Sequence, residues 1–210
     1  MTALSYAHGV TTVPLLGETI GAHFDRTVRR WGDHPGLISC QQGIRWRWRE
    51  LGEKVDAFAA GLVAMGLKPG ERVGIWSPNN AEWIVTQYAT AKAGLILVNI
   101  NPAYRLSEVE YALNKVGCRA LVTATRFKTS DYIGMINTLA PELAKARPGH
   151  LDSAKLPTLR SVIQIGGSAP GTIPFESVYG MASPRPIPSP AASFLPWSMR
   201  RAASAGCPRP

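Results

Sequence analysis

Acidic residues are missing from positions 181–210 of this 210-residue chain, and cysteine is scarce throughout. No apolar run approaches the ~20 residues that a membrane-spanning helix needs, so the sequence excludes such a helix. The composition, 45% hydrophobic and 18% charged, is that of a globular protein and excludes disorder of the whole chain. The first 17 residues contain neither Lys nor Arg and no apolar core of signal-peptide type. These absences predict a cytoplasmic protein.

The three cysteines are too few and too far apart for a disulfide framework. Cys40, Cys118 and Cys207 include no CxxC pair, and their number is odd. We therefore expect reduced, buried thiols rather than disulfides or a zinc site. The four histidines are scattered along the sequence, which favours structural or surface roles over metal binding; they are His8, His23, His34 and His150. The sequence predicts no metal site.

The positive charge is divided between two compositionally different parts of the chain. Residues 1–180 hold 19 basic and 14 acidic residues, a net charge of 19 − 14 = +5. Residues 181–210 hold four arginines and no acid, so they supply +4 of the total +9, together with 7 of the 17 prolines. Alternating prolines disfavour both helices and sheet ladders. The sequence predicts a domain at 1–180 and a disordered or out-of-frame tail at 181–210, rich in Pro, Ala, Ser and Arg.

Apolar periodicity predicts alternating strands and helices across the domain. The expected helices span 19–31, 51–65, 81–93, 107–116 and 130–140, and the expected strands span 37–40, 44–48, 72–76, 95–99, 119–123 and 161–165. The first two strands form a hairpin around Gln41–Gly43. From residue 72 onward the alternation is typical of right-handed βαβ units. The fold class is therefore α/β, with a parallel sheet flanked by helices.

Two local patterns predict finer detail. The segment Ser107–Glu110 fits a capping box, with Ser107 as the cap and a glutamate three residues later. In Arg45–Arg49, tryptophans alternate with arginines, which on a strand places both tryptophans on one face. We interpret this as a strand with one buried face. The alternative is a stacking platform for single-stranded nucleic acid.

Several linked segments resemble the adenylate-forming enzymes, and among them the AMP-dependent acyl-CoA synthetases of the medium- and long-chain fatty-acid branch. The segment Gly70–Trp83, GERVGIWSPNNAEW, is similar to the "GDRV…(S)PN…EW" segment of that family. Ala91–Pro102, AKAGLILVNINP, is similar to its "KAG…VN(I)NP" segment. Tyr104–Leu106 and Glu108–Gly117 continue the match in register, and Trp46–Leu51 resembles the family's "(Y/W)xEL" helix start.

The resemblance covers about residues 15–180 and implies a partial N-terminal domain of an acid–thiol ligase. Family members form an acyl-adenylate from a carboxylic acid and ATP, and then transfer the acyl group to coenzyme A. The implied partners of the full-length family are therefore a fatty acid, ATP, Mg²⁺ and CoA. The catalytic groups, among them a phosphate loop of the form TSGTTGxPK and a lysine from a C-terminal lid, lie beyond the matched region.

The phosphate loop is absent from this sequence. The nearest glycine-rich segment, Gly166–Thr172, is followed by no lysine and is better explained as a surface turn. Ser77, Asn79, Asn101 and Pro102 follow predicted strands, where α/β sheets usually bind ligands, but capping and turn formation explain them equally. We therefore assign no catalytic, cofactor-binding or metal-binding residue within this chain, and no oligomeric state.

The sequence leaves two functional hypotheses. The first is a fragment of a fatty-acyl-CoA synthetase, truncated before the phosphate loop and inactive alone unless another chain supplies the missing part. The alternative is a non-catalytic module that binds a protein partner through the domain surface or the proline-rich tail. The tail begins where the phosphate loop is expected, which favours an out-of-frame translation over a proline-rich ligand or a basic linker.

Overall fold

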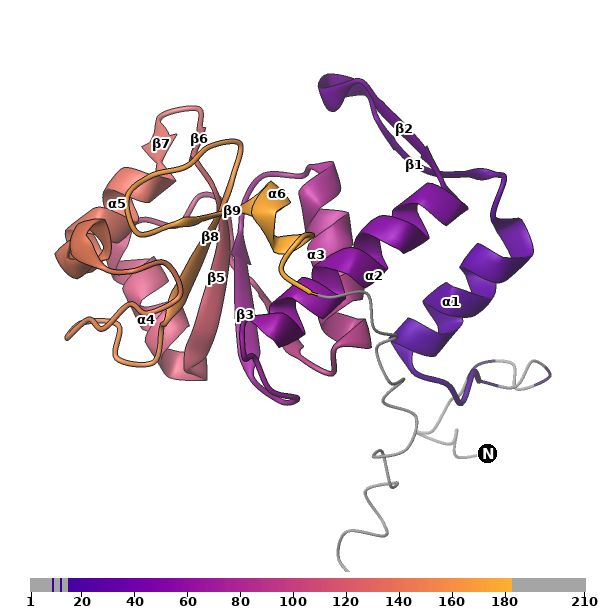
Figure 1. Ribbon diagram of the computed structural model, residues 1–210, viewed down its shortest axis with the longest axis horizontal. Coiled ribbons are helices and arrows are strands. Elements are labelled where there is room, and N and C mark those ends of the chain that lie inside the picture. The colour runs from indigo at the N-terminus through magenta and orange to yellow at the C-terminus, as the bar shows by residue number, and fades with distance from the viewer. Residues whose placement is uncertain (1–8, 10–11, 13–14, 183–210) are drawn as a thin grey trace, which may run out of the picture.

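A computed structural model describes residues 9, 12 and 15–182 of the chain. Its centre is a five-stranded parallel sheet with the strand order β4-β3-β5-β8-β9 (Figure 1). The strands are β3 (Arg72–Trp76), β4 (Ile96–Asn99), β5 (Cys118–Ala124), β8 (Ser161–Ile165) and β9 (Ile173–Pro174). The predicted α/β class is thus confirmed. The predicted disordered tail at 181–210 lies outside the described residues from position 183 onward.

Helices cover both faces of the sheet (Figure 1). On one face lie α2 (Trp48–Ala64), α3 (Ala81–Lys92) and the short α6 (Phe175–Val178), and α1 (Ile20–Trp31) packs on the outer side of α2 and α3 (Figure 1). On the other lie α4 (Leu106–Val116), α5 (Tyr132–Leu139) and the 3-10 helix η2 (Pro141–Lys145). Alternate residues of β3 point into different cores, because Val73 and Ile75 join the first cluster and Trp76 the second.

Helix ends follow the cap residues that the sequence offers. Thr19 caps α1, where its Oγ1 accepts a hydrogen bond from Ala22 N at 3.2 Å. Gly66 follows α2 and Gly117 ends α4, both with positive φ, as left-handed helix termini require. The predicted boundaries for these helices are confirmed to within a few residues.

The predicted cap at Ser107 is wrong, because α4 begins one residue earlier. Glu108 at the third helical position accepts a hydrogen bond from Arg105 N at 2.7 Å. The start of α2 is built in the same way, with Glu50 accepting from Arg47 N at 2.7 Å. Trp48 is therefore helical, and the predicted strand of alternating Trp and Arg ends at Arg47.

The N-terminal hairpin lies apart from the central sheet (Figure 1). It pairs β1 (Pro35–Ser39) with β2 (Ile44–Arg47), and the 3-10 turn η1 (Cys40–Gln42) joins them. Gly43 adopts φ 65° and lets the chain enter β2. Cys40 is exposed at this turn, so its predicted burial is wrong.

The other described cysteine has the predicted environment. Cys118 is fully buried at the start of β5, and burial raises the pKa of its thiol to about 11. Such a thiol is protonated at neutral pH and inert. The third cysteine, Cys207, lies outside the described residues. Within the described part of the chain, no helix is both long and apolar enough to cross a bilayer.

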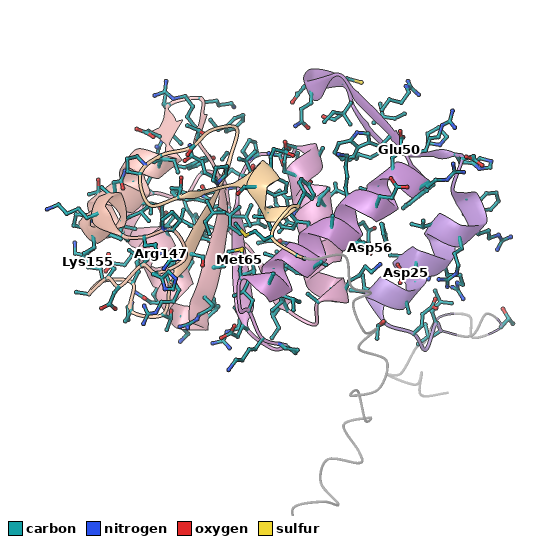
Figure 2. All side chains as sticks on the ribbon, viewed as in Figure 1. Asp25, Glu50, Asp56, Met65, Arg147 and Lys155 are labelled. Carbon is teal, nitrogen blue, oxygen red and sulfur yellow. The ribbon has the colours of Figure 1, made fainter. Side chains whose placement is uncertain are left out.

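A half-buried lysine ties the three helices of one layer together. Lys92, at the end of α3, reaches Asp25 of α1 at 2.5 Å and also contacts Asp56 of α2. Figure 2 shows Asp25 and Asp56 on the adjacent helices α1 and α2. Burial lowers the pKa of Lys92, but hydrogen bonds to both aspartates and their charges outweigh this, so the pKa is raised from 10.5.

Replacing this lysine should loosen the helical layer. In Lys92→Met the two carboxylates lose their shared cation, and we expect the free energy of unfolding to fall by about 1–2 kcal/mol, since both aspartates keep some solvent contact. Lys115→Met, at an exposed site, is the control and should cost little. Urea denaturation of both variants checks this.

The same contact sets a pH dependence. Because the folded-state pKa of Lys92 lies above its unfolded value, the stabilisation is complete below pH 10.5 and declines as the pH rises through the raised folded-state value. The stability difference between wild type and Lys92→Met should therefore be constant from neutral pH upward and shrink only in strong alkali. A difference that shrinks near pH 7 would contradict the ion-pair assignment.

Candidate functional site

All the loops that follow the parallel strands meet at one edge of the sheet, the carboxyl edge. Residues 77–80 follow β3, residues 100–105 follow β4, and residues 166–172 follow β8. A small hairpin follows β5 and extends past its end (Figure 1). Open α/β sheets bind their ligands at this edge, so it is the candidate functional site.

Of the polar residues after β3, only Asn79 is free for a ligand. Ser77 is fully buried, where its Oγ donates to Pro78 O at 3.0 Å and accepts from Asn80 Nδ2 at 2.7 Å. The side chain of Asn80 also accepts from Trp83 N at 2.8 Å and caps α3. Ser77 and Asn80 therefore shape the loop, and Asn79 is exposed.

Two buried aromatic side chains hold the loop after β4. Trp76 Nε1 donates to Asn101 O at 3.1 Å, and the Tyr132 hydroxyl donates to Pro102 O at 2.9 Å. The two rings pack 4.4 Å apart. The Asn101 side chain closes a turn by accepting from Ala103 N at 2.9 Å. Asn101 and Pro102 thus serve as a rigid frame for the edge.

Three cations gather where these loops meet, and the sequence analysis did not single them out. Arg126 and Lys128 lie on the hairpin of β6 (Arg126–Phe127) and β7 (Ser130–Asp131), and Arg105 precedes α4. Arg105 Nη2 contacts Thr129 Oγ1 at 3.4 Å, which joins the two loops. All three side chains are exposed. The signal in the sequence was the basic Thr125–Thr129 segment directly after a buried strand.

The glycine-rich segment after β8 is closed by its own hydrogen bonds. Gln164 Oε1 accepts from Ala169 N at 2.8 Å and from Thr172 Oγ1 at 2.9 Å. Gln164 Nε2 donates to Thr125 Oγ1 at 3.0 Å. Gly171 has φ 77°, and an added Cβ would lie 1.8 Å from Leu143 O, so glycine is required there for packing. The predicted surface turn at Gly166–Thr172 is confirmed.

A groove of about 420 Å³ opens between the N-terminal hairpin and α3. It is lined by both apolar and amide side chains; the lining residues are Leu37, Ile38, Ser39, Asn79, Asn80, Trp83, Ile84, Gln87 and Asn99. Asn79 and Asn99 place the groove beside the ends of β3 and β4. The groove can accept an apolar group and offer amide hydrogen bonds to a polar one.

Gln42 fixes one wall of this groove, and sequence reasoning assigned it only to a turn. Its Oε1 accepts from Ala81 N and from Ser39 Oγ, both at 2.8 Å, while its Nε2 donates to Glu82 Oε2 at 2.9 Å. One amide thus joins the hairpin tip to the N-terminus of α3. No local pattern predicts this contact, since the partners lie about forty residues apart.

Removing this amide should free the hairpin tip. We expect Gln42→Ala to lower the free energy of unfolding by about 1 kcal/mol, because the Ala81 N–H loses its cap. Amide hydrogen exchange at residues 39–43 should accelerate. Gln41→Ala changes the exposed neighbour and is the matched control. Equal exchange rates in the two variants would exclude the proposed anchoring role.

The described residues do not form a complete nucleotide site. The loops after β3, β4 and β8 contain no acidic side chain that could hold Mg²⁺. Across residues 9, 12 and 15–182 there is no group of three or more His, Cys, Asp or Glu that could hold a metal ion. The cations of the edge suit phosphate groups, but not metal binding. We derive no reaction step through a metal or ATP from these residues.

The fold is an α/β domain whose parallel sheet is covered on both faces. The cations and amides at its carboxyl edge suit it to anionic ligands. The AMP-binding enzyme family matches residues 24–189 of the sequence. The chain therefore belongs to that family, as its GERV…SPNN…EW and KAG…VNINP segments indicated.

Several relatives of the chain are acyl-CoA ligases. The mitochondrial medium-chain acyl-CoA ligase ACSF2 of Rattus norvegicus is 43% identical over 175 residues, which is 83% of this chain and 28% of that protein. The enzyme of the same name from Danio rerio is 46% identical over 168 residues, 80% of this chain and 28% of its own length. The chain thus spans little more than a quarter of these relatives.

Solved structures share the fold. The long-chain-fatty-acid-CoA ligase FadD1 of Archaeoglobus fulgidus superimposes with a TM-score of 0.67 at 21% identity, covering 90% of this chain and 36% of that one. At this identity the likeness concerns the fold alone. The described residues share the fold of about a third of that chain.

Proposed function

We propose that this chain corresponds to the N-terminal part of a fatty-acyl-CoA ligase, which joins a carboxylic acid to CoA through an acyl-adenylate at the expense of ATP. The observation that carries this proposal is the 43% identity over 175 residues to a medium-chain acyl-CoA ligase. We also propose the domain division at 1–180 and 181–210, and a cytoplasmic location, although the vertebrate relatives are mitochondrial.

The carboxyl edge supports one specific role within that reaction. Arg105 and Lys128 are exposed cations, and Arg105 Nη2 contacts Thr129 Oγ1, which follows Lys128 in the chain. Phosphate groups are natural partners of such side chains. CoA carries phosphate groups and, unlike ATP, needs no bound Mg²⁺, for which the described residues offer no site. We infer that Arg105, Arg126 and Lys128 receive the phosphates of CoA. The alternative function, a protein-interaction module, has no comparable observation in its favour.

The chain alone should not activate a fatty acid. It contains no TSGTTGxPK segment, and the described edge offers no site for Mg²⁺. We expect no ATP–pyrophosphate exchange above background with purified chain, Mg²⁺, ATP and a series of fatty acids. A complete acyl-CoA ligase in the same assay is the positive control. Exchange that depends on both fatty acid and chain would refute the predicted inactivity.

CoA binding tests the role of the edge directly. We expect the 210-residue chain to bind CoA weakly, and Arg105→Gln and Lys128→Gln each to weaken binding about five- to tenfold, since each removes a charge-assisted phosphate contact. Lys145→Gln, an exposed lysine on η2, is the matched control. Equilibrium dialysis against CoA measures all four proteins. Equal affinities, or no binding by wild type, would reject this site.

A further inference from the structure

A second basic surface lies at the opposite end of the molecule from α4 and α5. Six arginines and no lysine occupy residues 26–49: Arg26, Arg29 and Arg30 on α1, and Arg45, Arg47 and Arg49 on and after β2. We call this surface the arginine face. It belongs to α1 and the hairpin, which Figure 1 shows at the end of the molecule away from α4 and α5.

Few acids balance the arginine face. Glu18 pairs with Arg26, and Asp33 lies between Arg47, at 3.7 Å, and Arg49. Arg29 and Arg45 have no acidic partner within the described part of the chain. Three further acids lie nearby: Asp25 and Asp56 share the single cation of Lys92, and Glu50 accepts from a backbone N–H at the start of α2. The six arginines and Lys92 against these five acids leave a net charge of 7 − 5 = +2. The face therefore retains a positive excess.

The basic side chains line an open hollow next to the end of α1. The hollow has a volume of about 520 Å³, and its lining residues are Asp33, Pro35, Arg45, Trp46, Arg47, Arg49 and Glu50. Three guanidinium groups and two carboxylates line it; Asp33 pairs with Arg47 and Arg49, and Arg45 has no acidic partner in the described part of the chain. A guanidinium fork binds phosphate oxygens in a bidentate manner, which makes the hollow suited to a phosphate headgroup.

Large apolar side chains are exposed among these arginines. Ile20 is 63% exposed and Trp31 is 43% exposed, at the two ends of α1, and Ile38 of the hairpin is 48% exposed. Leu15 and Leu16 precede the helix and are also exposed. Arg30 lies over the Trp31 ring at 5.0 Å. Apolar and aromatic groups interspersed with arginines are typical of segments that lie in a membrane interface.

We propose that the arginine face binds the surface of a bilayer that contains anionic phospholipid. The arginines would contact lipid phosphates, and Ile20, Trp31 and Ile38 would enter the headgroup region. Lys92 holds α1 against α2 and α3, so the helix docks as a formed element and pays no folding cost on binding. The inference does not depend on the proposed ligase activity.

A nucleic acid fits this face less well. Binding of single strands needs free aromatic faces for base stacking. The tryptophans of the Arg45–Arg49 segment are occupied, since Lys54 Nζ lies 4.7 Å from the Trp46 ring and Trp48 packs edge-on against Phe24 with centroids 6.0 Å apart. Among the tryptophans of the described residues only Trp31 is exposed, and the Arg30 guanidinium lies over its ring. The sequence hypothesis of a stacking platform is therefore not favoured.

Vesicle sedimentation with the full 210-residue chain tests the proposal. The vesicles are phosphatidylcholine alone, or phosphatidylcholine with about 30% phosphatidylglycerol. We expect binding to the anionic vesicles that weakens as salt is raised, and at least tenfold weaker binding by the triple variant R29Q/R30Q/R45Q, since each basic residue near such a surface contributes about fivefold. Trp31→Ser should weaken binding, whereas the exposed Tyr111→Ser should not.

The matched control removes the same charge from the other end of the molecule. Lys145, Arg147 and Lys155 are exposed, and Figure 2 shows Arg147 and Lys155 far from Glu50 and Asp25. K145Q/R147Q/K155Q should bind within about twofold of wild type, because these residues lie outside the face. The arginines of residues 185–209 are unchanged in every variant, so they cannot produce a difference.

Three outcomes would overturn the proposal. The first is that the chain does not bind anionic vesicles. The second is that the two triple variants lose vesicle binding equally, and the third is that the chain binds neutral and anionic vesicles equally well. A parallel titration with a labelled single-stranded oligonucleotide covers the competing partner. If the oligonucleotide binds more tightly than the vesicles and R29Q/R30Q/R45Q abolishes that binding, the face is a nucleic-acid site instead. Circular dichroism melting confirms that each variant is folded.

Discussion

The parallel pairing of the central strands is the constraint on which the rest of the structure depends. β3 pairs in parallel with both β4 and β5, and β5 pairs in parallel with β8. The connections between these strands therefore contain helices, and the loops that follow the strands all lie at the same edge of the sheet. That pairing brings Arg105, which follows one strand, beside Thr129, which follows another. The cations of the edge converge only because the sheet is parallel.

Local sequence determines most of the fold, and the sequence analysis recovered it for that reason. Val73 and Ile75 alternate with residues of the opposite face, Thr19 and Asn80 cap helices, and Gly117 ends one. Each of these signals acts within a few residues. The prediction was wrong where two local signals competed. Ser107 was the predicted cap of α4, but Glu108 accepts a hydrogen bond from Arg105 N, and the helix begins one residue earlier.

The site residues were less predictable because their contacts join distant segments. Gln42 caps a helix about forty residues away, and Lys92 meets Asp25 across 67 positions. A single sequence offers no periodicity that relates such partners. For Ser77 and Asn101 the sequence correctly predicted a position at a strand end. It did not predict that both side chains accept hydrogen bonds from their own loops. The sequence therefore predicted which residues lie at the carboxyl edge, but not which of their side chains remain free to bind a ligand.

The cations of the carboxyl edge and the arginine face differ in how the fold positions their charges, and this difference suits them to different ligands. At the carboxyl edge two buried donors, Trp76 and Tyr132, fix the loop after β4, which carries Arg105, and so hold that charge at a defined position. Defined positions suit a single small anion. The arginine face instead spreads guanidinium groups over a helix and a hairpin, with Trp31 and Ile38 exposed between them. A dispersed charge with apolar contacts recognises an extended surface better than one ligand. In the fatty-acyl-CoA ligase proposed above both surfaces would have a use, because an acyl substrate partitions into membranes whereas CoA arrives from water.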